Sequence, residues 1–149
     1  MRAPQIVWAL VALAGIAGAA PSGSDFRSVG PGPAVMYDAP GAKARKIYAA
    51  PAGMPVEVVI TSGDWSRVRD ASGDLAWVES KVLTNKRMLV VEAAQAIARS
   101  APNETAPVAF TAAKGVLLEL AEPVASSWVK VRHRDGDTGY VKASDVWGE

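Results

Sequence analysis

Residues 63–78 read GDWSRVRDASGDLAWV, and residues 126–141 repeat the pattern 63 positions later as SSWVKVRHRDGDTGYV. Both stretches contain a tryptophan, any residue, a cation, a valine and an arginine, followed by a turn with aspartate and glycine. Asp-Gly between two β-like runs is a strong hairpin signal, because glycine accepts the positive φ that tight hairpin turns require. Each copy therefore predicts two strands joined by a turn.

The repeat extends beyond these stretches. Upstream the offset is 62, where Pro40 aligns with Pro102 and Glu57 aligns with Glu119. The second copy thus gains one residue relative to the segment 60–65, and such an insertion belongs in a loop. A solenoid needs at least three stacked units. Two separate small domains are therefore predicted, the first over residues 26–85 and the second over residues 86–149.

The beginning of the chain has the pattern of a signal peptide. Arg2 precedes an uncharged, mostly apolar run, and small residues precede a cleavage point after Ala19. A spanning helix needs about 20 apolar residues, and Pro21 ends this run too early. Residues 1–19 are therefore predicted to be a signal peptide, with an uncleaved anchor as the alternative.

The charge balance argues against a nucleic-acid partner. The whole chain has 16 Lys and Arg against 15 Asp and Glu, and removal of residues 1–19 takes away one cation, Arg2. The remaining chain has no net charge, so long-range attraction to phosphates has no support. The chain has no cysteine, which excludes disulfides, cysteine nucleophiles and thiolate metal sites.

Most of the remaining sequence is typical of short strands. Residues 56–60 (VEVVI) combine β-branched residues with a period of two, which favours a sheet over a helix. Residues 91–99 (VEAAQAIAR) are the one stretch of helix-forming composition. The repeat aligns the end of that stretch with the strand-like residues 34–37, so a strand and a helix both remain open there.

Several motifs occur in the same order in both copies: a strand of the type PVEVV, then G-x-W-x-x-V-R, a turn with Asp and Gly, and G-[WY]-V. This order resembles the bacterial Src-homology-3-like (SH3-like) domain, over residues 26–149 and most closely over 55–83 and 116–147. Ala76 departs from the pattern, which the second copy keeps as Gly139. The resemblance implies an all-β chain of two tandem small SH3-like β-barrels, each partly open and five-stranded, that act in targeting or binding.

No catalytic or metal constellation is apparent in the sequence. His133 is the one histidine, so no second histidine can share a metal or act in a pair. Asp64, Asp70 and Asp74 are interpreted as turn residues, because aspartate forms local hydrogen bonds there. We expect no enzyme activity, no metal and no cofactor.

One constellation remains, on the repeated strand. Because side chains alternate along a strand, the tryptophan and both cations of each copy share one face. Such a face could stack on a sugar or peptide and pair with carboxylates, although the tryptophans could instead serve packing alone. Asp64 beside Trp65 offsets positive charge and Ser127 beside Trp128 does not, so we expect the charges to matter for binding in the second copy only. The candidate ligand-binding residues are Trp65, Arg67, Arg69, Trp77, Trp128, Lys130, Arg132 and Tyr140.

These observations favour an exported, periplasmic or cell-envelope binding module that recognises peptidoglycan or a peptide segment. The alternative is a structural or assembly protein whose two barrels bind an envelope partner protein. Neither predicts binding to nucleic acid or stable membrane insertion after signal cleavage. Only residues 84–87 separate the two apolar patterns, so we also expect the domains to keep a nearly fixed mutual orientation.

Overall fold

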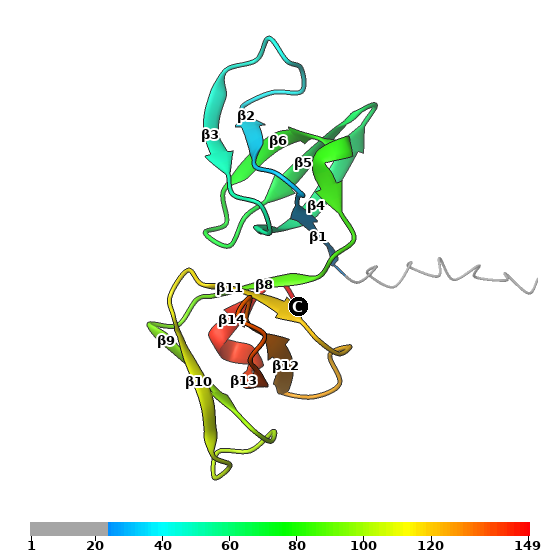
Figure 1. Cartoon of the computed structure of the whole chain (residues 1–149). Helices are drawn as coiled ribbons and strands as arrows, with labels where there is room; N and C mark the ends of the chain where they lie inside the picture. The colour runs from blue at the N-terminus through cyan, green and yellow to red at the C-terminus, as the bar shows by residue number, and fades with distance from the viewer. Residues whose placement is uncertain (1–23) are drawn as a thin grey trace, which may run out of the picture.

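The computed structural model describes residues 24–149 and shows an all-β chain of two domains, one after the other (Figure 1). Over these residues the regular structure consists of strands and two short 3₁₀ helices. The predicted cleavage after Ala19 lies outside the described residues. No helix within residues 24–149 is long and apolar enough to cross a membrane.

The first domain is one antiparallel sheet of seven strands, in the order β3-β2-β6-β5-β4-β1-β7. Its elements are β1 (Asp25–Val29), β2 (Ala34–Tyr37), β3 (Lys46–Ala50), β4 (Pro55–Ser62), β5 (Trp65–Arg69), β6 (Leu75–Glu79), the 3₁₀ helix η1 (Ser80–Val82) and β7 (Leu83–Thr84).

The second domain repeats this arrangement, in the order β10-β9-β13-β12-β11-β8-β14. Its elements are β8 (Met88–Val91), β9 (Gln95–Arg99), β10 (Val108–Ala113), β11 (Leu117–Leu120), β12 (Trp128–Arg132), β13 (Thr138–Lys142), the 3₁₀ helix η2 (Ala143–Asp145) and β14 (Val146–Trp147). The sequence repeat is thus a repeat of topology, and two tandem all-β domains are confirmed.

The sheets differ in detail from the five-stranded barrel that the resemblance implied. Each contains seven strands, the last of which is a two-residue strand that follows the 3₁₀ helix. Within residues 24–149 the end strands β3 and β7 do not pair with each other, nor do β10 and β14. Each domain is therefore a small open β structure.

Residues 91–99, for which the sequence allowed either a strand or a helix, have an extended conformation. Residues 91–99 contain the end of β8 and the whole of β9. Along β9, Ala96 and Ala98 are fully buried while Ile97 between them is 38% exposed. This alternation buries one face of a strand, so the alignment with residues 34–37 predicted the structure better than helix-forming composition did.

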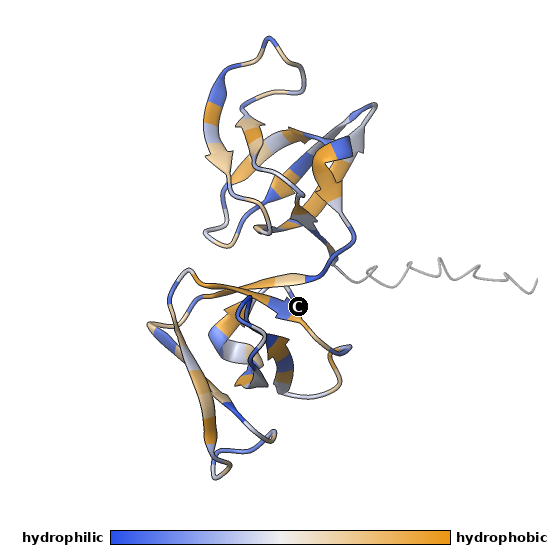
Figure 2. Cartoon of the chain, viewed as in Figure 1, coloured by the Kyte–Doolittle hydropathy of each residue, from blue (hydrophilic) through white to orange (hydrophobic). Residues whose placement is uncertain are grey.

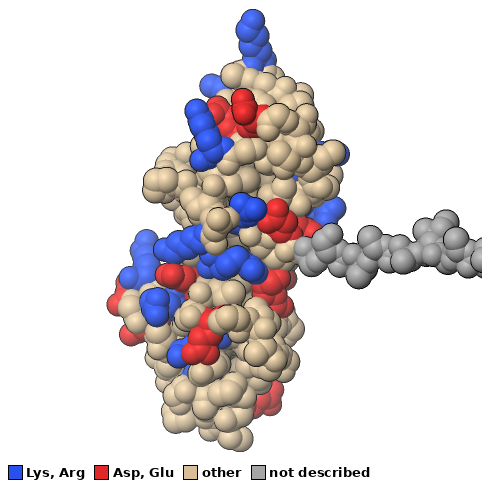
Figure 3. Space-filling model, turned by 90° about the vertical axis from the view of Figure 1, so that its right-hand side faces the viewer, with Lys and Arg blue, Asp and Glu red and all other residues tan. Residues whose placement is uncertain are grey.

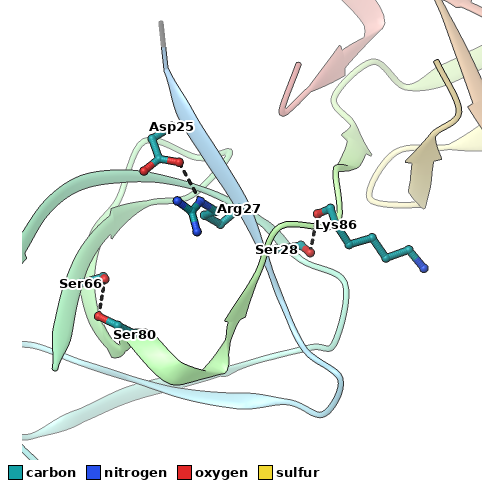
Figure 4. Close-up of polar contacts among 6 residues, drawn as sticks. All are labelled: Asp25, Arg27, Ser28, Ser66, Ser80 and Lys86. Carbon is teal, nitrogen blue, oxygen red and sulfur yellow. Dashed lines mark hydrogen bonds and ion pairs between the residues drawn. The ribbon is translucent and has the colours of Figure 1, made fainter. Parts of the chain in front are cut away.

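Each domain has its own apolar core. Apolar and polar residues alternate along the strands, as the colours in Figure 2 show, and the inward residues meet inside each domain. In the first core the serines of two neighbouring elements pair, since Ser66 and Ser80 lie 2.6 Å apart at their hydroxyl oxygens (Figure 4). The largest fully buried side chains of the two clusters are Met36, Val29, Val56, Val68 and Val78 in the first core and Leu89, Leu118, Val91, Val129, Val131 and Val141 in the second.

The one-residue insertion lies in a loop, as predicted. In the first domain β4 and β5 form a tight hairpin, where Gly63 has a φ of 56° and Ser62 pairs with Trp65. In the second domain β11 ends at Leu120, and residues 121–127 form the loop to β12. The two domains therefore differ beside the tryptophan of the repeated strand.

The two domains are packed together at the join. Ser28 of β1 is buried, and its hydroxyl donates to the carbonyl of Lys86 at 2.7 Å (Figure 4). The Arg87 guanidinium lies 5.5 Å from the centroid of the Phe26 ring and donates from Nη2 to the carbonyl of Gly148 at 2.9 Å. Residues at the join are thus packed between the domains, as expected from its short length.

Candidate functional site

The outer face of the first sheet carries an aromatic cluster. Trp65, Arg67 and Arg69 point away from the core, because Ser66 and Val68 between them are buried. Arg67 is directly opposite Trp77 on the neighbouring strand β6. These positions confirm the predicted alternation along the repeated strand.

A third aromatic side chain completes this cluster. Tyr37 of β2 pairs in register with Trp77, and its ring meets Trp65 edge to face at 5.2 Å between centroids and 85° between planes. Tyr37 is 8% exposed, whereas Trp65 and Trp77 are half-buried. We call Tyr37, Trp65, Arg67 and Trp77 the first aromatic face. Tyr37 is not among the residues predicted from the sequence, because its place beside Trp77 depends on the pairing of β2 with β6.

The two arginines of β5, Arg67 and Arg69, have different surroundings. Arg69 pairs with Glu57 of β4 at 3.1 Å. Arg67 is exposed, and it forms no ion pair with any residue in 24–149. Arg67 is therefore the cation of this face that is available to an anionic group.

On the corresponding face of the second domain, the central cation is paired. Lys130 lies 5.9 Å from the centroid of the Tyr140 ring and forms an ion pair of 2.9 Å with Glu122. The hydrogen bond that Lys130 Nζ donates to the Glu122 carboxylate raises the pKa of Lys130. Arg99 stands opposite Tyr140, where the first domain has Tyr37 opposite Trp77. We call Trp128, Lys130 and Tyr140 the second aromatic face.

This ion pair adds a charge that the residues next to the two tryptophans, Asp64 and Ser127, do not include. The structure places Glu122, from the loop 121–127 between β11 and β12, against Lys130. The second copy, not the first, has its central cation paired.

Arg132 belongs to a different surface from the other candidates. It lines a cavity of about 680 Å³ between the two domains, which we call the junction cleft. Figure 3 shows basic side chains gathered over the junction. The cleft is lined by Ala52 of the first domain, Lys86 of the join, and Met88, Val116, Leu117, Glu119, Arg132, His133, Arg134 and Gly136 of the second domain.

His133 lies at the start of the turn after β12 and not within the strand. Its ring is 5.9 Å from the Phe110 ring, and its Nδ1 lies 3.0 Å from Asp135 Oδ2. Its backbone N–H donates to the carbonyl of Asp137 and closes the turn. Its side chain thus packs at the edge of the junction cleft, which sequence spacing did not indicate.

The aspartates of the first domain are turn residues, as interpreted. Asp70 Oδ1 accepts hydrogen bonds from the backbone N–H groups of Ser72 and Asp74. Asp70 Oδ2 accepts a hydrogen bond of 3.1 Å from the Tyr48 hydroxyl. Over residues 24–149 no three His, Asp or Glu side chains are grouped closely enough to hold a metal ion.

The sequence family described as the bacterial SH3 domain matches this chain twice, over residues 30–85 and 92–148. The chain belongs to this family. Bacterial SH3 domains are binding modules, so the family agrees with a chain that presents surface faces and a cleft. A comparison with curated proteins gave no match.

Three solved structures are similar to the chain. NlpC2 and NlpC1 from Trichomonas vaginalis each have 13% sequence identity to this chain and a TM-score of 0.38. The match to NlpC2 covers 85% of this chain and 48% of NlpC2. The match to NlpC1 covers 89% of this chain and 49% of NlpC1. An NlpC/P60 family protein from Bacillus cereus shares 17% identity and a TM-score of 0.37, with 83% of this chain covering 56% of that one. This bacterial SH3 chain thus spans about half the length of those structures.

Proposed function

We propose that the protein is an exported, non-catalytic binding module of the bacterial cell envelope, which recognises cell-wall peptidoglycan or a peptide segment. The first aromatic face carries this proposal. It combines two half-buried tryptophans with one exposed cation, Arg67, on adjacent strands. Aromatic rings can stack on sugar rings or apolar side chains, and a guanidinium binds carboxylates in bidentate geometry.

The packing of the tryptophans supports a preorganised surface. Trp65 is held against Tyr37, and Tyr37 is nearly fully buried. A ring fixed by such contacts loses little conformational entropy when a ligand stacks on it. Packing and binding are therefore compatible roles for the same side chains.

The second aromatic face has a smaller role in this proposal. Lys130 is already paired with Glu122, so a ligand carboxylate would have to displace that partner. Arg69 is likewise paired with Glu57. The proposal therefore assigns the main contacts to Trp65, Arg67 and Trp77, and weaker ones to Trp128, Lys130 and Tyr140.

Export and domain limits are parts of the same proposal. The apolar run and small residues before residue 20 would direct the chain across the membrane, with cleavage after Ala19. Domain limits of 26–85 and 86–149 would place the boundary between β7 and β8. Sequencing the N-terminus of the secreted protein tests export, and a secreted form that begins at Met1 would contradict the cleavage.

Retention on purified cell wall tests the binding function. Wild-type protein should be retained and then released by soluble wall fragments, and Arg67→Gln should weaken this retention. Lys43→Gln is the control, because Lys43 is an exposed cation of the same domain that, like Arg67, forms no ion pair with any residue in 24–149. Absence of retention, combined with co-purification of one envelope protein, would instead support the structural or assembly alternative.

A further inference from the structure

We propose that the junction cleft binds the carboxylate end of a short apolar peptide. This inference goes beyond the proposed function, because the cleft uses different residues from the two aromatic faces. It is formed by both domains and the join together, and each wall supplies a different part of the chemistry.

The floor of the cleft is apolar. Met88, Val116 and Leu117 are half-buried, and Ala52 closes the cleft from the first domain. A volume of about 680 Å³ is in the usual range of small-molecule sites, roughly 300–1,000 Å³. The cleft therefore has room for a few residues with small or aliphatic side chains.

The rim of the cleft is positively charged. The charged groups that line the cleft are three cations, Lys86, Arg132 and Arg134, and one carboxylate, Glu119. Lys86 Nζ lies 3.6 Å from Glu119 Oε2. Arg132 and Arg134 are exposed and form no ion pair with any residue in 24–149. Two guanidinium groups above an apolar floor fit a ligand with a carboxylate at one end and an apolar body.

The first domain places its turn directly on this floor. Gly53 lies beside Ala52, and a Cβ atom built at Gly53 would be 3.5 Å from both Leu117 Cδ1 and Met88 Cε. The cleft therefore depends on the contact between domains. A ligand seated there would contact both domains and stabilise their packing.

The repeat explains why the site occurs once. At the offset of 63, the positions of Arg132 and Arg134 are occupied in the first copy by Arg69 and Ala71. Arg69 is paired with Glu57, and alanine carries no charge. The first domain thus lacks the pair of available arginines that the second domain presents at the junction.

A peptide titration of the whole protein tests this site. The probe is acetyl-Leu-Ala-Ala with a free carboxylate, compared with the same peptide as a C-terminal amide. In ¹⁵N NMR spectra the acid should shift the amide signals of Leu117 and Gly136, and the amide form should bind about tenfold more weakly, the loss expected for a charge-assisted contact. Equal binding of the two peptides, or no binding of the acid, would overturn the proposal.

Variants separate the cleft from general charge effects. Arg132→Gln with Arg134→Gln should weaken binding of the acid by about tenfold or more. The control, Lys43→Gln with Arg45→Gln, removes two exposed cations of the first domain and should leave the affinity unchanged. Equal losses in both double variants would show that only net charge matters and would refute the site.

Glu119→Gln provides a test in the opposite direction. Removal of the one carboxylate in the lining should strengthen binding of the acid peptide and leave the amide peptide unaffected. Weaker binding of the acid would contradict the assigned charge pattern. These tests use a soluble peptide and leave Arg67 unchanged. A negative result for the cleft would therefore not contradict the proposed retention on cell wall.

Discussion

Phe26, in the first strand of the first domain, meets Trp147, in the last strand of the second, edge to face, with ring centroids 5.1 Å apart and planes at 88°. Such pairs contribute about 0.5–1.5 kcal/mol beyond the area they bury. Arg87 of the join lies over the Phe26 ring. The contact connects residues far apart in the sequence and holds the two sheets together.

A double-mutant cycle measures this contact. Phe26→Ala, Trp147→Ala and the double variant should give a coupling of about 0.5–1.5 kcal/mol in urea unfolding. A control cycle pairs Phe26 with Phe110, whose ring lies against His133 in the second domain. A coupling as large in the control as in the test pair would show that the rings do not interact specifically.

The same contact predicts that the domains move as one body. NMR relaxation should give a common rotational correlation time for both domains of the wild-type protein. Trp147→Ala combined with Arg87→Ala should let them reorient separately, because the edge-to-face contact and the bond to Gly148 are both lost. Independent tumbling in the wild-type protein would contradict a fixed orientation.

Charge removal on the two aromatic faces should have unequal effects. Arg67→Gln should weaken retention on cell wall by about tenfold, whereas Lys130→Gln should have a smaller effect because Glu122 already pairs with Lys130. Both variants should stay within about 0.5 kcal/mol of wild-type stability in thermal unfolding, as surface substitutions usually do. Equal loss of retention would show that the pair with Glu122 does not limit the second face.

The close contact at Gly139 predicts a domain-specific defect. A Cβ at this position would lie 2.9 Å from the Cβ of Ala98 and 3.2 Å from the carbonyl oxygen of Arg99. Gly139→Ala should therefore destabilise the second domain by about 1–3 kcal/mol, the usual cost of overpacking. Adding Ala98→Gly should recover part of the loss in urea unfolding. No recovery would mean that the backbone of Arg99 is the main obstacle.

Tyr48 should make stability depend on pH in alkaline solution. Burial, followed by the neighbouring Asp70 carboxylate, raises the pKa of Tyr48 above its ordinary value of 10.0. The folded state thus holds this proton more tightly than the unfolded state, so the stabilisation is complete below the unfolded pKa and is lost as pH rises above it.

Ultraviolet titration of tyrosinate checks this prediction. Tyr48→Phe should remove the ionisation that occurs at the highest pH. Asp70→Asn should move that ionisation to lower pH, because the carboxylate no longer opposes the phenolate. An unchanged titration in Asp70→Asn would exclude Asp70 as a cause.

Much of the fold could be predicted from the sequence. The repeat at 62 to 63 positions indicated two units of the same topology, and alternation at β5 and β12 indicated which side chains face outward. These features are local, because a strand alternates its side chains regardless of what packs against it. Residues 91–99 show the limit of composition, since burial of Ala96 and Ala98 by the sheet outweighed a modest helix preference.

The functional surfaces depended on contacts that spacing along the chain does not contain. Tyr37 contacts Trp65 because β2 lies beside β6, and Lys130 is paired with Glu122, which lies in the loop between β11 and β12. Arg132, grouped from the sequence with Trp128, lies instead at a cleft closed by Ala52 of the other domain. The sequence determined which faces each strand presents, through local periodicity. Only the tertiary structure decided which charges remain available, because charge pairing depends on distances of a few ångströms between segments that packing alone brings together.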